Sequence, residues 1–464
     1  MKRRDFLRTV GVTALGSWAT RHTLDAAAQV TSTLPAPATS GIEHVVVVMM
    51  ENRSFDHLLG WLPKADGRQR GLKYVDTAGV VHHTYPLAPD YTGCGHPDPD
   101  HSYEGGRIEY DNGAMDGFLK GSNDEYAIGF YGPRDKPFFS ALAYAYTTID
   151  RSFCSILGPT FPNRFFMHAA RTDRLENTYC YGCSPSNDLC PSELPTIWDS
   201  LLAAGVSCRY YFSNVPFLGL WGAKYLPVTA TYPQFLVDAA TGSLPAVSFV
   251  DPVFTLGSET TGGDDHPHAD IRVGDAFLAQ TFHAVASSPV WSSTVFIITY
   301  DEWGGFFEHV PPPRAAVELR DDLTIHYTNC DHDLVDGKAL LGFRVPTVIA
   351  SPWTRSPDTD PRVQHIVTDH TSILKLIEWR WGLEPLTARD ASSDVQNLAL
   401  ALDFSNPNPI VPNLPTPIPP VPQACPGTGA ATTTASSSTA TRTSEWGRLL
   451  DSGLLAGWPL PAAR

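Results

Sequence analysis

HVVVVMMENRSFDHLLGW, residues 44–61, places a dense cluster of polar side chains directly after four valines and two methionines. The apolar run has the length and β-branched composition of a fully buried strand. It passes at once into a carboxylate, an amide, a guanidinium, a hydroxyl, a second carboxylate and an imidazole. Polar groups at the end of a core strand cost free energy unless they bind something. The stretch therefore predicts a buried strand whose carboxyl end carries a functional site.

Three further runs have the same character. They are residues 246–250, 294–300 and 345–350, all short and rich in Val, Ile, Phe or Thr, with helical patterns such as TIWDSLLAAG and DHTSILKLIEWRWG between strands. This alternation predicts an α/β fold with a mostly parallel central sheet and helices on both faces. Ligands of such sheets bind beyond the carboxyl ends of the strands. Three of the four runs end in polar clusters, namely ENRSFDH, DP and DEWGG.

Composition divides the chain into regions. With 464 residues and 42% hydrophobic content, one large domain with insertions or two domains are both possible. We assign residues 40–404 to the catalytic domain, 405–445 to a linker that is Pro-rich and then Ser/Thr-rich, and 446–464 to a tail that could form a short docking helix.

A net charge of −16 argues against nucleic acid as a partner. It leaves small phosphorylated substrates open, because a metal ion neutralises phosphate locally.

The amino terminus resembles a twin-arginine export signal. Lys2, Arg3 and Arg4 precede a weakly apolar segment and three alanines at 26–28, so residues 1–28 are predicted to be removed on export to the periplasm or the medium. An ordinary basic terminus is the alternative. No other run reaches the roughly 20 apolar residues of a membrane span, so the mature protein is predicted to have no transmembrane segment.

Three of the eight cysteines, Cys180, Cys183 and Cys190, crowd into one loop. In an oxidising compartment such a cluster predicts a disulfide staple. A zinc site is the alternative, which the absence of a second CxxC pair disfavours.

Two dipeptides, Glu51-Asn52 and Asp301-Glu302, stand at the ends of predicted strands. Alone, each is better explained as a helix cap or a solvated strand end. Together they offer four oxygen ligands from two strand ends, which suits one divalent cation such as Ca²⁺, Mg²⁺ or Mn²⁺, although zinc or iron would also accept carboxylates. The residues from Arg53 to His57 are then expected to brace the turn by hydrogen bonding.

The stretch SILGPTFPNRFFMHAAR supplies a candidate nucleophile. Pro162 is suited to the first turn of a helix, which places the Thr160 hydroxyl near the positive end of that helix. Thr160 as a simple helix cap is an equally good interpretation of this stretch alone. A metal at its hydroxyl would make it a nucleophile at neutral pH.

Histidines complete the candidate site. We expect His101, His266 and His309 to hold phosphate oxygens or to protonate a leaving group, and His96 and His268 to be ordinary surface residues. Asp369 and His370 could bind a second metal, but the apolar spacing of the residues that follow favours Asp369 as a helix cap with His370 packed nearby.

Six motifs in order, HVVVVMMENRSFDHLLG, GAMDGF, GPTFPNRFFMHAA, DDHPH, TYDEWGGFFEHVPPP and DHTSILKLIEWRWGL, resemble the bacterial phosphoesterase family that includes haemolytic and non-haemolytic phospholipases C and AcpA-type acid phosphatases. The resemblance implies an alkaline-phosphatase-like fold and hydrolysis through a covalent phospho-enzyme. It implies that Glu51, Asn52, Thr160, Asp301 and Glu302 are the metal ligands, that Thr160 is also the nucleophile, and that His101, His266 and His309 contact the phosphate and the leaving group.

The resemblance also bears on the substrate. Phospholipase C members have Thr where acid phosphatase members tend to have Ser, so Thr160 favours phosphodiesters such as phosphatidylcholine, including a phospholipid at a membrane surface. A phosphomonoesterase of the same chemistry is the alternative. A non-catalytic secreted binding protein is the third hypothesis, and against it every proposed ligand and nucleophile position carries a reactive residue.

Overall fold

The structure is a computed structural model of the whole chain, and it describes residues 34–178, 189–256, 262–317, 334–357, 360–421, 425 and 444–461. The described residues belong to one structural unit. The predicted export signal, Cys180, Cys183 and Cys330 lie outside them. Among the described cysteines, Cys190 is disulfide-bonded.

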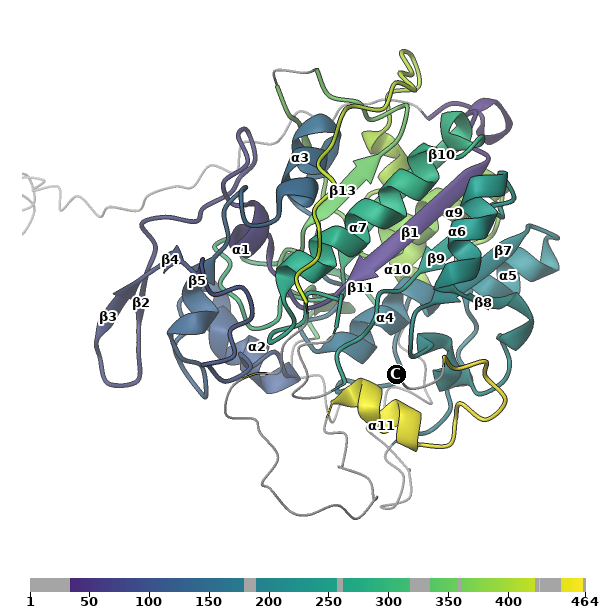
Figure 1. Cartoon of the computed structure of the whole chain (residues 1–464). Helices are drawn as coiled ribbons and strands as arrows, with labels where there is room; N and C mark the ends of the chain where they lie inside the picture. The colour runs from purple at the N-terminus through teal and green to yellow at the C-terminus, as the bar shows by residue number, and fades with distance from the viewer. Residues whose placement is uncertain are drawn as a thin grey trace, which may run out of the picture. The chain divides into compact units, whose positions relative to one another are not determined.

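An eight-stranded sheet forms the centre of the fold, in the order β14-β6-β13-β10-β1-β9-β7-β8 (Figure 1). The strands are β1 (His44–Met50), β6 (Thr147–Ile149), β7 (Cys208–Phe212), β8 (Thr229–Thr231), β9 (Val247–Val250), β10 (Thr294–Tyr300), β13 (Thr347–Ala350) and β14 (Arg362–Gln364). All neighbours pair in parallel except the two pairs that involve β13. The predicted mostly parallel sheet is confirmed, and all four strands inferred from apolar runs are present.

The direction of β13 explains a feature of the sequence. Of the four apolar runs, residues 345–350 alone lack a polar cluster at their end. Because β13 is antiparallel to β10, its carboxyl end lies at the opposite edge of the sheet from those of its neighbours. The carboxyl ends of β1, β9 and β10 share one edge, with Met50 opposite Tyr300 and Val48 opposite Val250. This edge is where a ligand is expected.

Alternate residues of β1 enter two separate apolar cores, one on each face of the sheet. Val46, Val48 and Met50 pack in the first core, and Val45, Val47 and Met49 in the second. Helices α3 (Pro137–Ala145), α6 (Tyr232–Thr241) and α7 (Ile271–Ala286) cover the first core, and α4 (Thr160–Ala169), α5 (Ile197–Ala203), α9 (Thr371–Trp381) and α11 (Glu445–Asp451) cover the second. The prediction of helices on both faces is therefore confirmed.

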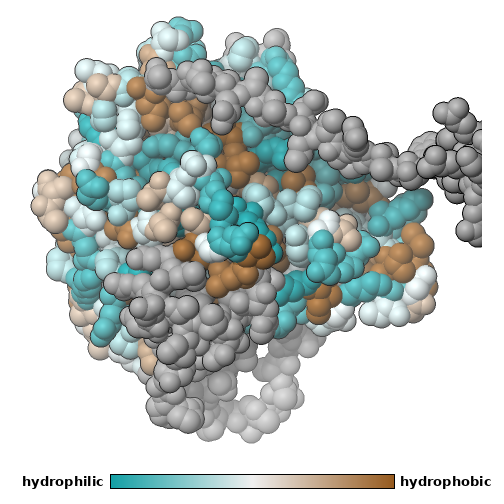
Figure 2. Space-filling model, turned by 180° about the vertical axis from the view of Figure 1, so that it is seen from behind, coloured by the Kyte–Doolittle hydropathy of each residue, from teal (hydrophilic) through white to brown (hydrophobic). Residues whose placement is uncertain are grey.

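Shorter elements decorate this core. The other α-helices among the described residues are α1 (Phe55–Leu59), α2 (Tyr103–Tyr110) and α10 (Ala388–Ala391). Three two-stranded sheets pair β2 (Lys73–Val75) with β3 (Val81–His83), β4 (Tyr85–Pro86) with β5 (Gly129–Phe130), and β11 (Arg314–Ala316) with β12 (Lys338–Leu340). The face seen in Figure 2 carries hydrophilic and hydrophobic side chains interspersed. Within the described ranges, no helix is both long and apolar enough to cross a membrane.

The region after residue 404 returns to the domain in three places. The Pro-rich arm contacts the loop after α7, where the Trp291 indole donates a hydrogen bond to the Pro409 carbonyl at 2.9 Å. Cys425 forms a disulfide with Cys94, 331 residues earlier in the chain. Helix α11 then packs near α4, beyond the carboxyl end of β1, and buries Trp446 and Leu449 (Figure 1).

Candidate active site

The two strand-end dipeptides lie side by side, because β1 and β10 are adjacent and in register. The backbone N–H of Asn52 donates to Asp301 Oδ1 at 3.0 Å, and the backbone N–H of Asp301 donates to the Met50 carbonyl at 3.1 Å. All four side chains of the dipeptides are fully buried. The structure thus brings together Glu51, Asn52, Asp301 and Glu302, as their matching positions in the sequence suggested.

A close approach of two backbones shapes this turn. Asn52 adopts a positive φ of 56°, and Gly304 adopts a φ of 65°. A Cβ at position 304 would overlap the Asn52 carbonyl oxygen, so only glycine fits there. Gly304 therefore allows the loop after β10 to pass directly over the end of β1.

The residues after Asn52 brace the turn as expected. The Arg53 guanidinium donates to the Asp265 carbonyl at 2.7 Å, and the Ser54 hydroxyl donates to the Phe307 carbonyl at 2.7 Å. The His57 ring contacts the Gly129 carbonyl through Nδ1 at 2.9 Å. These contacts fix the loop that presents Glu51 and Asn52.

Arg164 neutralises several of the carboxylates at this edge. Its guanidinium reaches Glu51 Oε1 at 3.1 Å, Asp301 Oδ2 at 3.0 Å and Asp251 Oδ1 at 3.2 Å. Burial lowers the pKa of Arg164, but these three carboxylates outweigh it and the net pKa is raised. Sequence reasoning missed Arg164 and Asp251. Arg164 could have been found from its spacing of four residues from Thr160, which puts these two side chains on one face of α4. Asp251 could have been found from the DP dipeptide after β9.

The site retains more negative than positive charge. Three buried carboxylates, those of Glu51, Asp251 and Asp301, pair with the one guanidinium of Arg164, and the carboxylate of Glu302 is buried as well. The pKa values of Glu51 and Glu302 are both raised well above that of an ordinary glutamate. Burial is the larger cause in each case, and the charge of Asp301 is the second.

Among the residues that the structure describes, one carboxylate oxygen of this site, on Glu302, lacks a hydrogen-bond donor. Glu302 Oε1 is buried and has no hydrogen-bond partner among the described residues. A buried carboxylate oxygen without a partner is costly, and hard divalent cations prefer carboxylate, amide and hydroxyl oxygens. The residues present therefore fit a divalent cation.

Thr160 is the first residue of α4 and is fully buried. Its hydroxyl donates to Asn52 Oδ1 at 3.4 Å, which joins α4 to the end of β1. The N-cap position belongs to Pro159, so the Thr160 side chain does not cap the helix. Pro162, expected in the first turn, is the third residue of the helix. The hydroxyl is directed at the dipeptides rather than at its own backbone.

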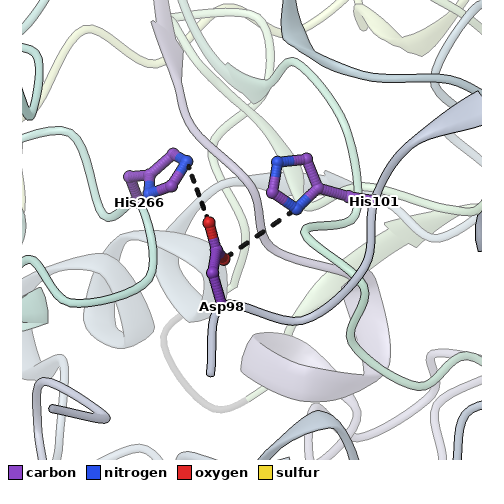
Figure 3. Close-up of side chains that lie close together, drawn as sticks. All are labelled: Asp98, His101 and His266. Carbon is purple, nitrogen blue, oxygen red and sulfur yellow. Dashed lines mark ion pairs between the residues drawn. The ribbon is translucent and has the colours of Figure 1, made fainter. Parts of the chain in front are cut away.

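His101 and His266 approach the same region with Asp98 between them (Figure 3). Their rings meet edge to face with centroids 5.7 Å apart, and each forms a 3.9 Å ion pair with Asp98. Nδ1 of each ring contacts a backbone carbonyl, that of Pro99 or of Pro267. Nε2 of His101 lies 3.3 Å from Asn52 Nδ2 and 3.9 Å from Glu302 Oε1. Asp98 was not identified from the sequence.

The charge around His266 favours its protonated form. Burial lowers the pKa of its imidazole, but the carboxylates of Asp98, Glu445 and Asp264 outweigh burial and raise the pKa above its ordinary value. A protonated imidazole at this position can donate a proton.

His309 lies in a different cluster. Its Nδ1 contacts Asp56, its Nε2 contacts Asp66 at 3.2 Å, and Glu308 and Arg344 complete the group. Burial lowers the pKa of His309, but hydrogen bonds to Asp56 and Asp66 raise it to about 9. Arg344 also binds Glu308 at 2.6 Å. Sequence reasoning grouped His309 with His101 and His266, whereas the described contacts of His309 all belong to this buried ion-pair network.

Asp369 precedes His370, the N-cap residue of α9, and its carboxylate accepts from the first amide of that helix. Its Oδ1 accepts from the Thr371 amide at 2.8 Å, and its Oδ2 pairs with Arg389 at 2.8 Å. His370 is buried, with Nε2 3.0 Å from the Tyr300 carbonyl. These contacts use both carboxylate oxygens of Asp369 and agree with the capping interpretation.

An open pocket of about 540 Å³ borders the site. His101 and Pro159, the residue before Thr160, line it together with Asp98, Glu176 and Arg448. Arg448 belongs to α11, so the tail forms part of the pocket wall. The pocket gives a solvent route toward the start of α4.

Comparison with known proteins identifies relatives of the whole domain. The sequence model of the Phosphoesterase family matches residues 42–384. Phospholipase C B of Mycobacterium tuberculosis is 33% identical, over 85% of this chain and 84% of its own. Non-specific phospholipase C1 of Arabidopsis thaliana is 31% identical, over 75% of this chain and 69% of its own. Among solved structures, a protein in the alkaline phosphatase superfamily from Vibrio parahaemolyticus matches 79% of this chain and 71% of its own, with 12% identity and a TM-score of 0.37.

Proposed function

The chain belongs to the Phosphoesterase family and is a phosphoric ester hydrolase, and we propose that it is an exported, metal-dependent phospholipase C that acts through a phosphothreonine on Thr160. The preferred substrates would be phosphodiesters such as phosphatidylcholine. The relatives named phospholipase C, similar over most of this chain, support the reaction class. The arginine pair near the amino terminus supports export.

The position of Thr160 is the observation that carries the proposal. Its hydroxyl is fully buried at the start of α4 and bonded to Asn52, next to the carboxyl ends of β1 and β10. A helix amino terminus favours negative charge, which suits both an ionised hydroxyl and a phosphoryl group. Pro159, the residue before Thr160, lines the pocket, so the pocket lies next to the start of α4.

The residues that would hold the cation are Glu51, Asn52, Thr160, Asp301 and Glu302. Asp301 already accepts from Arg164 and from two backbone amides, but each carboxylate oxygen has more than one lone pair, so a cation can share it. When bound, a divalent cation would supply positive charge that stabilises the phosphoryl oxygens and lowers the pKa of the threonine hydroxyl.

The chain's own residues would then perform two steps. In the first, the bond from Thr160 Oγ1 to phosphorus forms, its proton passes to a carboxylate of the site, and the bond from phosphorus to the diacylglycerol oxygen breaks. Protonated His266 donates its proton to that leaving oxygen. In the second step, water gives a proton back to His266 and attacks phosphorus. The bond to Oγ1 breaks, the carboxylate returns its proton to the Thr160 oxygen, and the phosphorylated head group leaves.

Two variants of Thr160 test this chemistry. Thr160→Ala should lose at least about 10³-fold in kcat, because no nucleophile remains, whereas Thr160→Ser should keep a measurable rate. The unfolding temperatures of both variants should stay close to that of the parent. Near-normal turnover of Thr160→Ala would refute the phosphothreonine.

A substrate panel tests the reaction class. Purified protein is assayed with and without chelator on phosphatidylcholine, p-nitrophenylphosphorylcholine and p-nitrophenyl phosphate. A preference for the two diesters supports a phospholipase C. A preference for the monoester would instead make the protein an acid phosphatase, and equal rates with and without chelator would remove the metal from the proposal.

A further inference from the structure

We propose that the C-terminal segment 444–461 is part of the active site, in which Glu445 supplies an additional carboxylate to the cation site and Trp446 positions Glu51. This inference rests on the proposed function for the presence of a divalent cation. Glu445 falls at the end of the region predicted to be a linker and Trp446 at the start of the predicted tail.

Trp446 binds the carboxylate of Glu51 from 395 residues away in the sequence. Its indole N–H lies 3.0 Å from Oε1 and 3.1 Å from Oε2. The indole is fully buried and stacks on Phe254, with ring centroids 3.6 Å apart and an interplanar angle of 7°. Phe161, the residue after Thr160, meets it edge-on at 5.2 Å. Trp446 therefore has one orientation, and in that orientation its only donor faces Glu51.

Glu445 brings a further negative charge to the same place. One carboxylate oxygen of Glu445, one of Glu51 and a ring nitrogen of His266 all lie within 4.8 Å of one another. Glu445 Oε1 is buried and lacks a hydrogen-bond partner within the described part of the chain.

Two buried carboxylate oxygens near the histidines thus lack partners, one on Glu445 and one on fully buried Glu302. His101 Nε2 is 3.9 Å from the Glu302 oxygen. Buried carboxylate oxygens that lack a hydrogen-bond donor are costly, and the ligand types present suit a divalent cation.

The segment is fixed to the domain independently of these two residues. Leu449, Leu455 and Trp458 are buried in the same core as α4 and β1, and the Trp458 indole donates to the Gly222 carbonyl at 3.1 Å. The disulfide from Cys94 to Cys425 attaches the preceding chain to the loop before His101. The segment is therefore a packed part of the domain, which is what a positioning role requires.

Matched variants of the full chain separate this role from packing. Glu445→Gln removes one charge with little change in volume, and Trp446→Phe keeps an aromatic ring while removing the donor. Asp451→Asn, at the exposed end of α11, and Trp458→Phe, which loses a donor to a backbone carbonyl, are the controls. Each protein is stripped with chelator and titrated with Mn²⁺ by calorimetry, and its unfolding temperature is measured without metal.

We expect each test variant to weaken Mn²⁺ binding by about 10-fold or more, because Glu445→Gln replaces a carboxylate of the cation site by an amide and Trp446→Phe removes an outer contact to Glu51. The two controls should bind within about threefold of the parent. Unchanged Mn²⁺ affinity in both test variants, or higher turnover in either, would overturn the inference.

The same titration distinguishes failure of the inference from failure of the proposed function. If the parent protein binds Mn²⁺ and both test variants bind it equally well, the tail has no role in the cation site, and the proposed function stands. If the parent binds neither Mn²⁺ nor Ca²⁺, Mg²⁺, Zn²⁺ or Fe²⁺, the metal dependence itself is refuted, together with this inference.

Discussion

Replacing Arg164 by methionine should destabilise the metal-free protein strongly at neutral pH and weakly in acid. The guanidinium is buried and contacts three carboxylates at 3.0–3.2 Å. Removing one partner from a buried ion-pair network costs about 3–5 kcal/mol, because the remaining charges lose their compensation. With an unfolding entropy of about 2.1 cal/mol/K per residue, roughly 0.9 kcal/mol/K for this domain, the loss corresponds to about 3–6 °C.

The pH dependence identifies charge as the cause. The pKa of Glu51 is raised above its ordinary value by burial and by Asp301, and Arg164 opposes that rise. Without Arg164 the folded-state pKa rises further. The folded variant then holds a proton that the unfolded chain has already lost, so its stability falls as pH increases above the unfolded pKa. At pH 5 the protonated carboxylate needs no countercharge, and most of the deficit should disappear.

The assay is calorimetric or fluorescence-detected unfolding of parent, Arg164→Met and Arg164→Lys in chelator, at pH 5 and pH 8. Arg164→Lys keeps the charge but not the fork of donors, so it should lie between the other two. Adding Mn²⁺ at pH 8 should restore part of the stability of Arg164→Met, because a cation replaces the missing charge. An equal loss at both pH values would show that Arg164 acts by packing alone and would refute the reasoning.

Three further changes probe other parts of the molecule. The pKa of His309 is raised to about 9, so protonated His309 should stabilise the fold fully below pH 6.5. This contribution, at most about 3 kcal/mol, should be lost as the pH rises through about 9. His309→Gln should therefore flatten the fall in unfolding temperature between about pH 6.5 and about 9.5. Gly304→Ala should cost about 1–3 kcal/mol and lower activity, because a Cβ there displaces Asn52; full activity would contradict the close approach. Cys94→Ser combined with Cys425→Ser should lower stability by about 2–5 kcal/mol, measured by denaturant unfolding of both proteins under non-reducing conditions.

Local patterns were enough to predict the central elements. The valine run before Glu51 and the apolar run before Asp301 specified two buried strands, and their polar endings placed two dipeptides at one edge of a parallel sheet. The prediction succeeded because strand length, β-branched composition and the common edge of parallel strands are properties of short segments and of sheet geometry. Thr160 was found for the same reason, since the prolines around it mark the start of a helix.

The sequence by itself determined four central strands and the polar residues that follow the carboxyl ends of three of them, β1, β9 and β10. Only the tertiary structure decided which polar groups pair with one another: Arg164 with three carboxylates, Trp446 with Glu51, and His309 with a separate network. These partners are up to 395 residues apart and belong to no shared motif. A buried charge takes whichever partner the packed chain brings within hydrogen-bonding distance, and that distance is set by how whole elements pack rather than by the residues beside the charge in the sequence.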